Sequence, residues 1–159
     1  AGCGAALQWL AAAAVESAVL RRWTHFAAED KNAIFSAIFS CLIPPALKPG
    51  LSSMAATKLS KALVHVVKQR WPEEDPGFID RLLAAATVPG TSAAALRVVA
   101  VSFEELAGAE DAAVPSVPAV RAEALRGHVA RAAPAAAATL VNLLREVAPR
   151  ALDNAADAA

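Results

Sequence analysis

Cysteine and aromatic residues are scarce in this chain of 159 residues. It has no tyrosine, five phenylalanines, three tryptophans and only two cysteines, Cys3 and Cys41. Two cysteines without a Cys-x-x-Cys spacing form neither a disulfide framework nor the thiolate set of a structural zinc site. Because one lies near the start of the chain and the other on an apolar helix stripe, we expect buried or free thiols, which suit a reducing compartment.

An excess of charge of either sign is also missing. Fifteen acidic residues balance fifteen basic ones, so the formal net charge is zero. Basic residues gather only in short groups such as Arg21-Arg22, which are too sparse for a nucleic-acid-binding stripe. The chain therefore has no global field that favours nucleic acid or an anionic membrane, and we expect neither as a partner.

Long uninterrupted apolar runs are absent. The run 7–20 contains Glu16, and the run 33–47 contains Pro44-Pro45. Neither reaches the roughly 18–20 apolar residues that a membrane-spanning helix needs. Residues 1–6 carry no basic segment ahead of an apolar run, which a secretory signal would require. The sequence therefore predicts neither a spanning helix nor a secretory signal.

The residue patterns that carry chemistry are missing as well. His25, His65 and His128 stand in no metal-ligand spacing. The acidic runs 73–75 and 104–105 point neighbouring carboxylates apart, whereas acid–base catalysis on a glycoside needs two of them to face one substrate. The glycines are scattered and form no phosphate-binding loop. We predict no enzyme activity, no metal and no cofactor.

What the chain does have is alanine and helical periodicity. Hydrophobic residues make up 57% of it, a share raised by alanine, the best helix former. We predict an all-α protein, with Ser53 as the cap of the third helix and Pro134 as a candidate kink in the last. The expected helices cover residues 7–23, 28–42, 53–71, 76–86, 91–106 and 118–147.

These helices recur with a regular spacing. The third one ends at Trp71-Pro72, Trp23 ends the first one 48 residues earlier, and the fifth ends 36 residues after Trp71. The two spacings lie on either side of the period of about 40–47 residues in two-helix HEAT repeats. We therefore predict an α-α superhelix, a HEAT/ARM-like solenoid. Its three antiparallel helix pairs would cover about 7–42, 53–86 and 91–147, followed by a frayed tail at 148–159.

Other expectations depend on this architecture. Trp23 and Trp71 should be buried at equivalent positions, as packing residues between repeats. The first helix is already under way at Ala1, so we expect a fragment of a larger protein. A single closed six-helix bundle is the alternative fold, and the repetition of tryptophan-terminated helices favours the open stack.

The stretch around Trp71 also resembles a known family. Its residues 58–71 read Lys-Leu-Ser-Lys-Ala-Leu-Val-His-Val-Val-Lys-Gln-Arg-Trp, and they precede Pro72, the Pro-x-Phe-Ile of 76–79 and the Glu-Glu-Leu of 104–106. This series is similar to the N-terminal HEAT repeats of exportins, nuclear export receptors of the karyopherin-β (importin-β) superfamily. The resemblance extends over about residues 7–144 and is strongest over 58–106.

Within that family the similarity is greatest to the exportin-six group. It rests on Ser-Phe-Glu-Glu-Leu-Ala at 102–107, the acidic pair 110–111, and the Arg-x-Glu-x-Leu of 121–125. The chain departs from many exportins at Glu74 and Asp75, where they carry an aromatic residue soon after Trp-Pro. The alanine-rich last helix also matches only loosely.

The resemblance implies a function in nuclear export. Exportins shuttle between nucleus and cytoplasm, bind RanGTP together with protein cargo, and contact nucleoporins; the exportin-six group carries profilin–actin. Ran contacts in this family come chiefly from the second helix of each N-terminal pair. The charged residues expected on those helices are the candidates for Ran binding: Lys31, Asp80, Arg81, Arg121 and Arg126.

Two other functions stay open at this point. One is a HEAT/ARM-type protein-interaction scaffold, or an importin, without the Ran-dependent export role. The other is a small helical enzyme or ligand-binding protein, which the lack of a convergent polar group of residues makes the weakest of the three.

Overall fold

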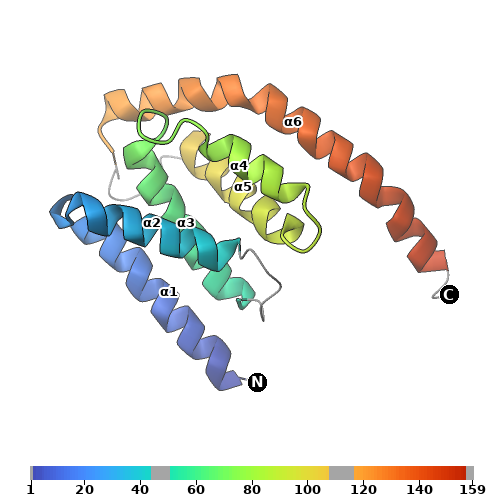
Figure 1. Ribbon diagram of the computed structural model, residues 1–159, viewed down its shortest axis with the longest axis horizontal. Coiled ribbons are helices and arrows are strands. Elements are labelled where there is room, and N and C mark those ends of the chain that lie inside the picture. Colours follow the sequence, from blue (N-terminus) through green and yellow to red (C-terminus); the bar gives the residue numbers. More distant parts are fainter. Residues whose placement is uncertain (1, 44–50, 108–116, 157–159) are drawn as a thin grey trace.

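The structure is a computed structural model that describes residues 2–43, 51–107 and 117–156, with side chains over 4–43, 51–107 and 117–146. The expected loops at 44–50 and 108–116, the pair 110–111 and the Cys3 thiol lie outside these parts. The described residues form helices and no strand, which confirms the all-α class (Figure 1). The elements are α1 (Gly2–Arg22), the short 3-10 helix η1 (Trp23–His25), α2 (Ala28–Leu42), α3 (Ser53–Arg70), α4 (Phe78–Ala86), α5 (Ser92–Ala107) and α6 (Ala119–Ala156).

Local sequence signals account for most helix ends. The N-cap of α3 is Ser52, whose hydroxyl accepts a hydrogen bond from the backbone N–H of Ala55, so the cap lies one residue before the predicted Ser53. Pro72 lacks an N–H and stops the helix just after Trp71. Glu29 and Asp30 lie in the first turn of α2, as predicted, where carboxylates favour the positive end of the helix dipole.

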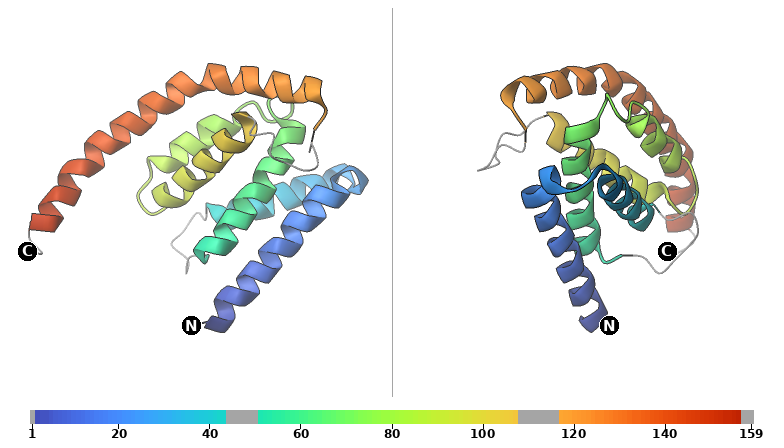
Figure 2. Two further views of the ribbon diagram at one scale, coloured as in Figure 1. Left: turned by 180° about the vertical axis from the view of Figure 1, so that it is seen from behind. Right: turned by 60° about the vertical axis from the view of Figure 1, so that its left-hand side comes forward.

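The helices run in two opposite directions. Side-chain contacts join corresponding positions along α1, α3 and α5. Near the starts of α1 and α3, Gln8 accepts a hydrogen bond from the N–H of Ser52, and further along Glu16 pairs with Lys58. Near the ends of α3 and α5, Lys68 pairs with Glu105. These three helices are therefore parallel neighbours, and we call them the parallel row. Figure 2 shows them side by side, while α2, α4 and α6 return in the opposite direction.

The helix contacts differ from the expected consecutive pairs. The closest neighbours are α1 with α3, α4 with α5, and α3 with α5, and α2 rests on α3. Helices α1 and α2 meet at η1 and then diverge (Figure 1). Within the predicted pairs 7–42 and 53–86, the two helices therefore have little direct contact, whereas α5 and α6 of the third pair pack on each other. The reason lies in α3, which is apolar around most of its circumference and receives helices on several sides.

The core is centred on α3 and α4. Leu63, Phe78 and Leu82 are completely buried, and the rest of the core extends from α1 to the first half of α6. Trp23 and Trp71 are 8% and 4% exposed, each at the C-terminal end of a helix of the parallel row, so their predicted burial at similar positions is confirmed. Helices α1 and α6 lie on opposite sides of the array, which is open and not a closed bundle (Figures 1 and 2).

The last helix is longer than predicted. α6 continues to Ala156, into the segment that we expected to be a frayed tail. Its 38 residues correspond to about 57 Å. Alanine supplies strong helix propensity on both sides of Pro134. Pro134 removes one backbone donor without ending the helix, and α6 curves over α4 and α5 (Figure 1).

Candidate interaction surfaces

The joint between α3 and α4 is held by an arginine from α6. Arg121 donates from Nε to the carbonyl of Lys68 (3.2 Å), from Nη2 to that of Trp71 (2.5 Å) and from Nη1 to the carboxylate of Glu73 (2.5 Å). The last carbonyls of a helix lack partners within it, and a guanidinium fork can supply several donors at once. Arg121 therefore fastens the start of α6 to the end of α3.

The indole of Trp71 fills the space beneath this clamp. Its ring meets His128 of α6 edge to face, with the ring centroids 5.5 Å apart. Arg131, one turn further along α6, has Nη2 2.6 Å from His128 Nδ1, so we assign this ring nitrogen as the acceptor. The hydrogen bond from Arg121 holds the pKa of the exposed Glu73 carboxyl below its usual range. Hydrogen bonds and ring packing from α6 thus hold this joint, while Trp71 Nε1 and Arg70 Nη1 are buried without a hydrogen-bond partner among the described residues.

The equivalent joint at Trp23 is simpler. Trp23 packs edge to face on Phe26 with the centroids 6.4 Å apart, and the ammonium of Lys31 lies 5.8 Å from the indole centroid. A cation over an aromatic face is attracted by the ring quadrupole. Lys31, one of the five Ran-binding candidates, thus already contacts the packing residue of its own joint.

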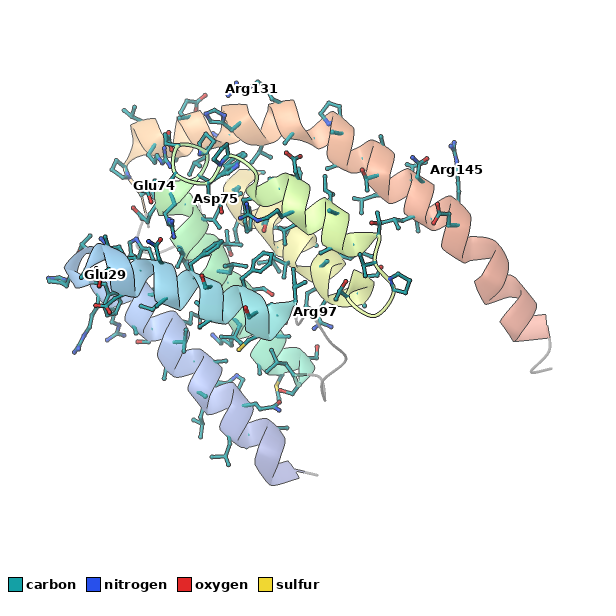
Figure 3. The ribbon with its side chains drawn as sticks, in the orientation of Figure 1. Glu29, Glu74, Asp75, Arg97, Arg131 and Arg145 are labelled. Atoms are coloured by element: carbon teal, nitrogen blue, oxygen red, sulfur yellow. The ribbon has the colours of Figure 1, made fainter. Side chains whose placement is uncertain are left out.

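The other candidate residues stand on α4 and α6. Arg81 donates to Asp75 at 2.6 Å, and this hydrogen bond raises the pKa of the guanidinium. Arg126 pairs with Glu123 at 2.5 Å, and Asp80 is exposed in the first turn of α4. The structure brings Arg81 and Arg121 to the same joint, where Glu74 and Asp75 lie beneath the first part of α6 (Figure 3). Lys31 and Arg126 are held by separate local contacts, and Asp80 is exposed.

A polar stripe on α3 was missed by sequence reasoning. Lys58, Lys61, His65 and Lys68 recur at three- and four-residue spacing on the partly exposed side of α3. Lys58 meets Glu16 of α1 at 2.7 Å, and Lys68 meets Glu105 of α5 at 2.9 Å. The sequence contains one signal that could have indicated this stripe: each of two glutamate–lysine pairs is separated by about one repeat. The separations are 42 and 37 residues.

The surroundings shift the pKa of His65 on this stripe and that of Glu105, which faces the stripe from α5. Burial, reinforced by the charge of Lys68, lowers the pKa of His65 below its ordinary value of 6.5. Burial acts to raise the pKa of the Glu105 carboxyl, but the hydrogen bond and the charge of Lys68 together outweigh it, so that pKa is lowered. At neutral pH the stripe therefore contains an ion pair beside a neutral imidazole.

Large apolar side chains are exposed on the two outermost helices of the array, α1 and α6 (Figure 1). On α1, Leu7 is 62% and Leu10 56% exposed; on the second half of α6, Val141 is 44% and Leu144 67% exposed. Contiguous apolar surface of this kind marks contacts with other proteins more often than chemistry. These two regions are the most conspicuous unpaired surfaces of the described chain.

Other kinds of site find no support in the described residues. No three His, Cys, Asp or Glu side chains in that part of the chain come together as metal ligands. Among its helices, none combines the length and the apolar character needed to cross a bilayer. Cys41 is a free, exposed thiol. No protein-family model, curated protein or solved structure matches the chain.

Proposed function

We propose that the chain is a helical-repeat scaffold that binds other proteins and catalyses no reaction. The observation that carries this proposal is the open array of helices: its outermost helices, α1 and α6, expose leucines and a valine, while its interior is packed. Arrays of this kind grow by the addition of helices, which cover the apolar faces at their ends. Apolar faces that are left exposed there are therefore suited to contacts with other proteins.

A HEAT-like superhelix is the finer form of this proposal. In favour of it, helices of alternating direction form two sets, and contacts between successive members of the parallel row occur at offsets of 42–44 and 37 residues. Buried tryptophans end the first two members of the row. The weak contact between α1 and α2 is the feature least typical of such repeats.

A Ran-dependent export receptor remains the narrower proposal within this class. It is supported by the sequence resemblance and by the second helices α2, α4 and α6, which carry the candidate residues on one set of similarly directed helices. In this proposal the protein shuttles between nucleus and cytoplasm and binds RanGTP, nucleoporins and a protein cargo such as profilin–actin. Arg121 is a poor contact candidate because its guanidinium already holds the α3 joint.

The experiment compares binding of the purified chain to Ran loaded with GTP and with GDP. The export proposal expects retention of the GTP form alone, and weaker retention by a Lys31→Glu/Arg81→Glu/Arg126→Glu variant, with the loss shrinking as salt rises. Lys61→Glu on α3, at a residue that is exposed and lies outside the second helices, is the control for a charge reversal elsewhere. Equal binding of both nucleotide forms, or of neither, rejects the export proposal and leaves the scaffold.

The scaffold proposal has its own test. Crosslinking followed by mass spectrometry of the chain with a bound protein partner should map contacts to exposed helix faces, and no partner should be chemically changed. Turnover of a substrate that depends on a residue of this chain would reject it.

A further inference from the structure

We propose that this chain associates with a second copy of itself head to tail, with α1 of one copy lying beside α5 and beneath the second half of α6 of the other. The proposal goes beyond the scaffold function and does not depend on it. It rests on the order of the parallel row and on what its two ends expose.

The head is the outer face of α1. Ala12 and Val19 point into the core beside α3 and are 2% and 3% exposed. The opposite face carries Leu7, Leu10, Ala14, Ser17 and Arg21, which are all exposed and recur at three- and four-residue spacing. Apart from Arg21 at its end, this face has no charge. It has the pattern of a helix surface that packs on another helix.

The tail is formed by α6 and α5. Leu125, Val129 and Ala136 of α6 are buried against the body, and the same helical stripe continues through the half-buried Leu140 and Leu143 to a part of α6 that extends past α5 (Figure 2). Arg131 and Arg145 lie on the outer side of α6 (Figure 3), so the apolar stripe is on the inner side. The contact surface thus continues as a stripe whose leucines keep only part of their surface exposed in the described chain.

The adjoining face of α5 is suited to a close helix neighbour. Ala93, Arg97, Ala100 and Glu104 are exposed there, and the alanines allow two backbones to approach. Leucines on the head of one copy and alanines on the tail of the other are complementary in size. A helix added to the parallel row beside α5 would therefore contact apolar side chains of α6 on one side and the small alanines of α5 on the other.

Charge selects the direction of the contact. The last turns of α1 and α3 contain the basic residues Arg21, Arg22, Lys68 and Arg70, but the last turn of α5 contains none and instead exposes Glu104. An α1 helix added in the direction of the row brings Arg21 and Arg22 to this acidic end, as Lys68 meets Glu105 within the chain.

A symmetric contact between two α1 heads fits less well. An antiparallel pair of α1 helices would place each Arg21-Arg22 at the positive N-terminal end of its partner, and it would leave the tail uncovered. A head-to-tail contact is heterologous, so copies can add in rings or open chains.

Two variants separate these arrangements. Leu10→Glu damages only the head, and Leu143→Glu damages only the tail. Each side chain lies outside the fully buried core, so both variants should keep the helical circular dichroism of the parent chain. Val120→Glu, at a side chain that is 85% exposed on the first turn of α6, is the matched control. Molar mass is measured by size-exclusion chromatography with light scattering between roughly 1 and 200 μM, the range of weak contacts.

The parent chain and the Val120 control should form dimers and larger species as concentration rises. Each damaged variant alone should associate roughly 30-fold or more weakly, as expected for loss of a central contact residue. A one-to-one mixture should form a dimer and nothing larger, because one intact head meets one intact tail. A parent chain that stays monomeric throughout overturns the proposal. So does a mixture that stays monomeric, or a Leu143→Glu variant that associates as the parent does, which would indicate head-to-head pairing.

Discussion

Replacement of Trp71 by alanine should strongly destabilise the fold. The indole is 4% exposed, and its removal leaves a cavity between the end of α3 and His128 of α6. Removing a buried aromatic side chain costs about 3–5 kcal/mol. With a urea dependence of about 2 kcal/mol per molar, the midpoint of unfolding should fall by roughly 1.5–2.5 M.

Trp71→Phe tests which part of the side chain matters. Phenylalanine keeps a ring against His128 and removes the indole N–H, whose Nε1 is buried without a hydrogen-bond partner among the described residues. We expect a loss of about 1–2 kcal/mol, well below that of alanine, because most of the apolar contact is retained.

The assay is urea unfolding followed by circular dichroism at low protein concentration. Trp9→Ala is the control, since this third tryptophan is 39% exposed and its loss should stay within about 0.5 kcal/mol. A Trp71→Ala loss below about 1 kcal/mol would show that the joint is not packed as described. Equal losses for phenylalanine and alanine would show that the apolar contact is not the source of the stability.

Three further substitutions test other contacts. Arg121→Met should cost about 1.5–3 kcal/mol in urea unfolding, because the carbonyls of Lys68 and Trp71 lose a charged donor; Arg126→Met, with its guanidinium on the same helix, should cost less. Ser52→Ala should cost about 1 kcal/mol, measured in the same way, through loss of the α3 cap. The folded pKa of His65 is lowered, so its contribution is present above the unfolded value of 6.5 and is lost as pH falls below it; His65→Gln should flatten the decline in stability from pH 7 to 5.

The sequence was sufficient to locate the helices and the two packing tryptophans. Apolar spacing and the punctuation at Trp71-Pro72 and Pro89-Gly90 are local signals, and helices depend on local interactions. The C-terminal end of α6 was harder to predict, because the helix propensity of alanine on both sides of Pro134 outweighs the loss of one hydrogen bond.

The partners of each helix could not be predicted in the same way. An apolar face shows that a helix is buried, but not which neighbour covers it. α3 is apolar on several sides, so it accepts α1, α2 and α5, and the expected hairpin of α1 with α2 gives way to that larger contact. The pairs Glu16 with Lys58 and Lys68 with Glu105 reflect this arrangement in the sequence, but at long separations.

The candidate residues show the same limit. Lys31 and Arg121 were selected as charged side chains on second helices, and the structure places both against a tryptophan-containing joint. Their contacts depend on how helix ends meet in space, which spacing along one helix does not reveal. Asp80 and Arg81 keep exposed surface on α4, so they remain the simpler contact candidates.

The alternation of helix direction has an electrostatic consequence. Each helix carries partial negative charge at its C-terminus and partial positive charge at its N-terminus. The ends of α1 and α3 and the starts of α2 and α4 therefore meet along one edge, where Arg21, Lys68 and Arg70 follow the former and Glu29 and Asp80 open the latter. Each side chain there opposes the partial charge of its own backbone. Charged side chains thus interact favourably with the helix dipoles along this edge, and added salt should weaken that interaction even where no ligand binds.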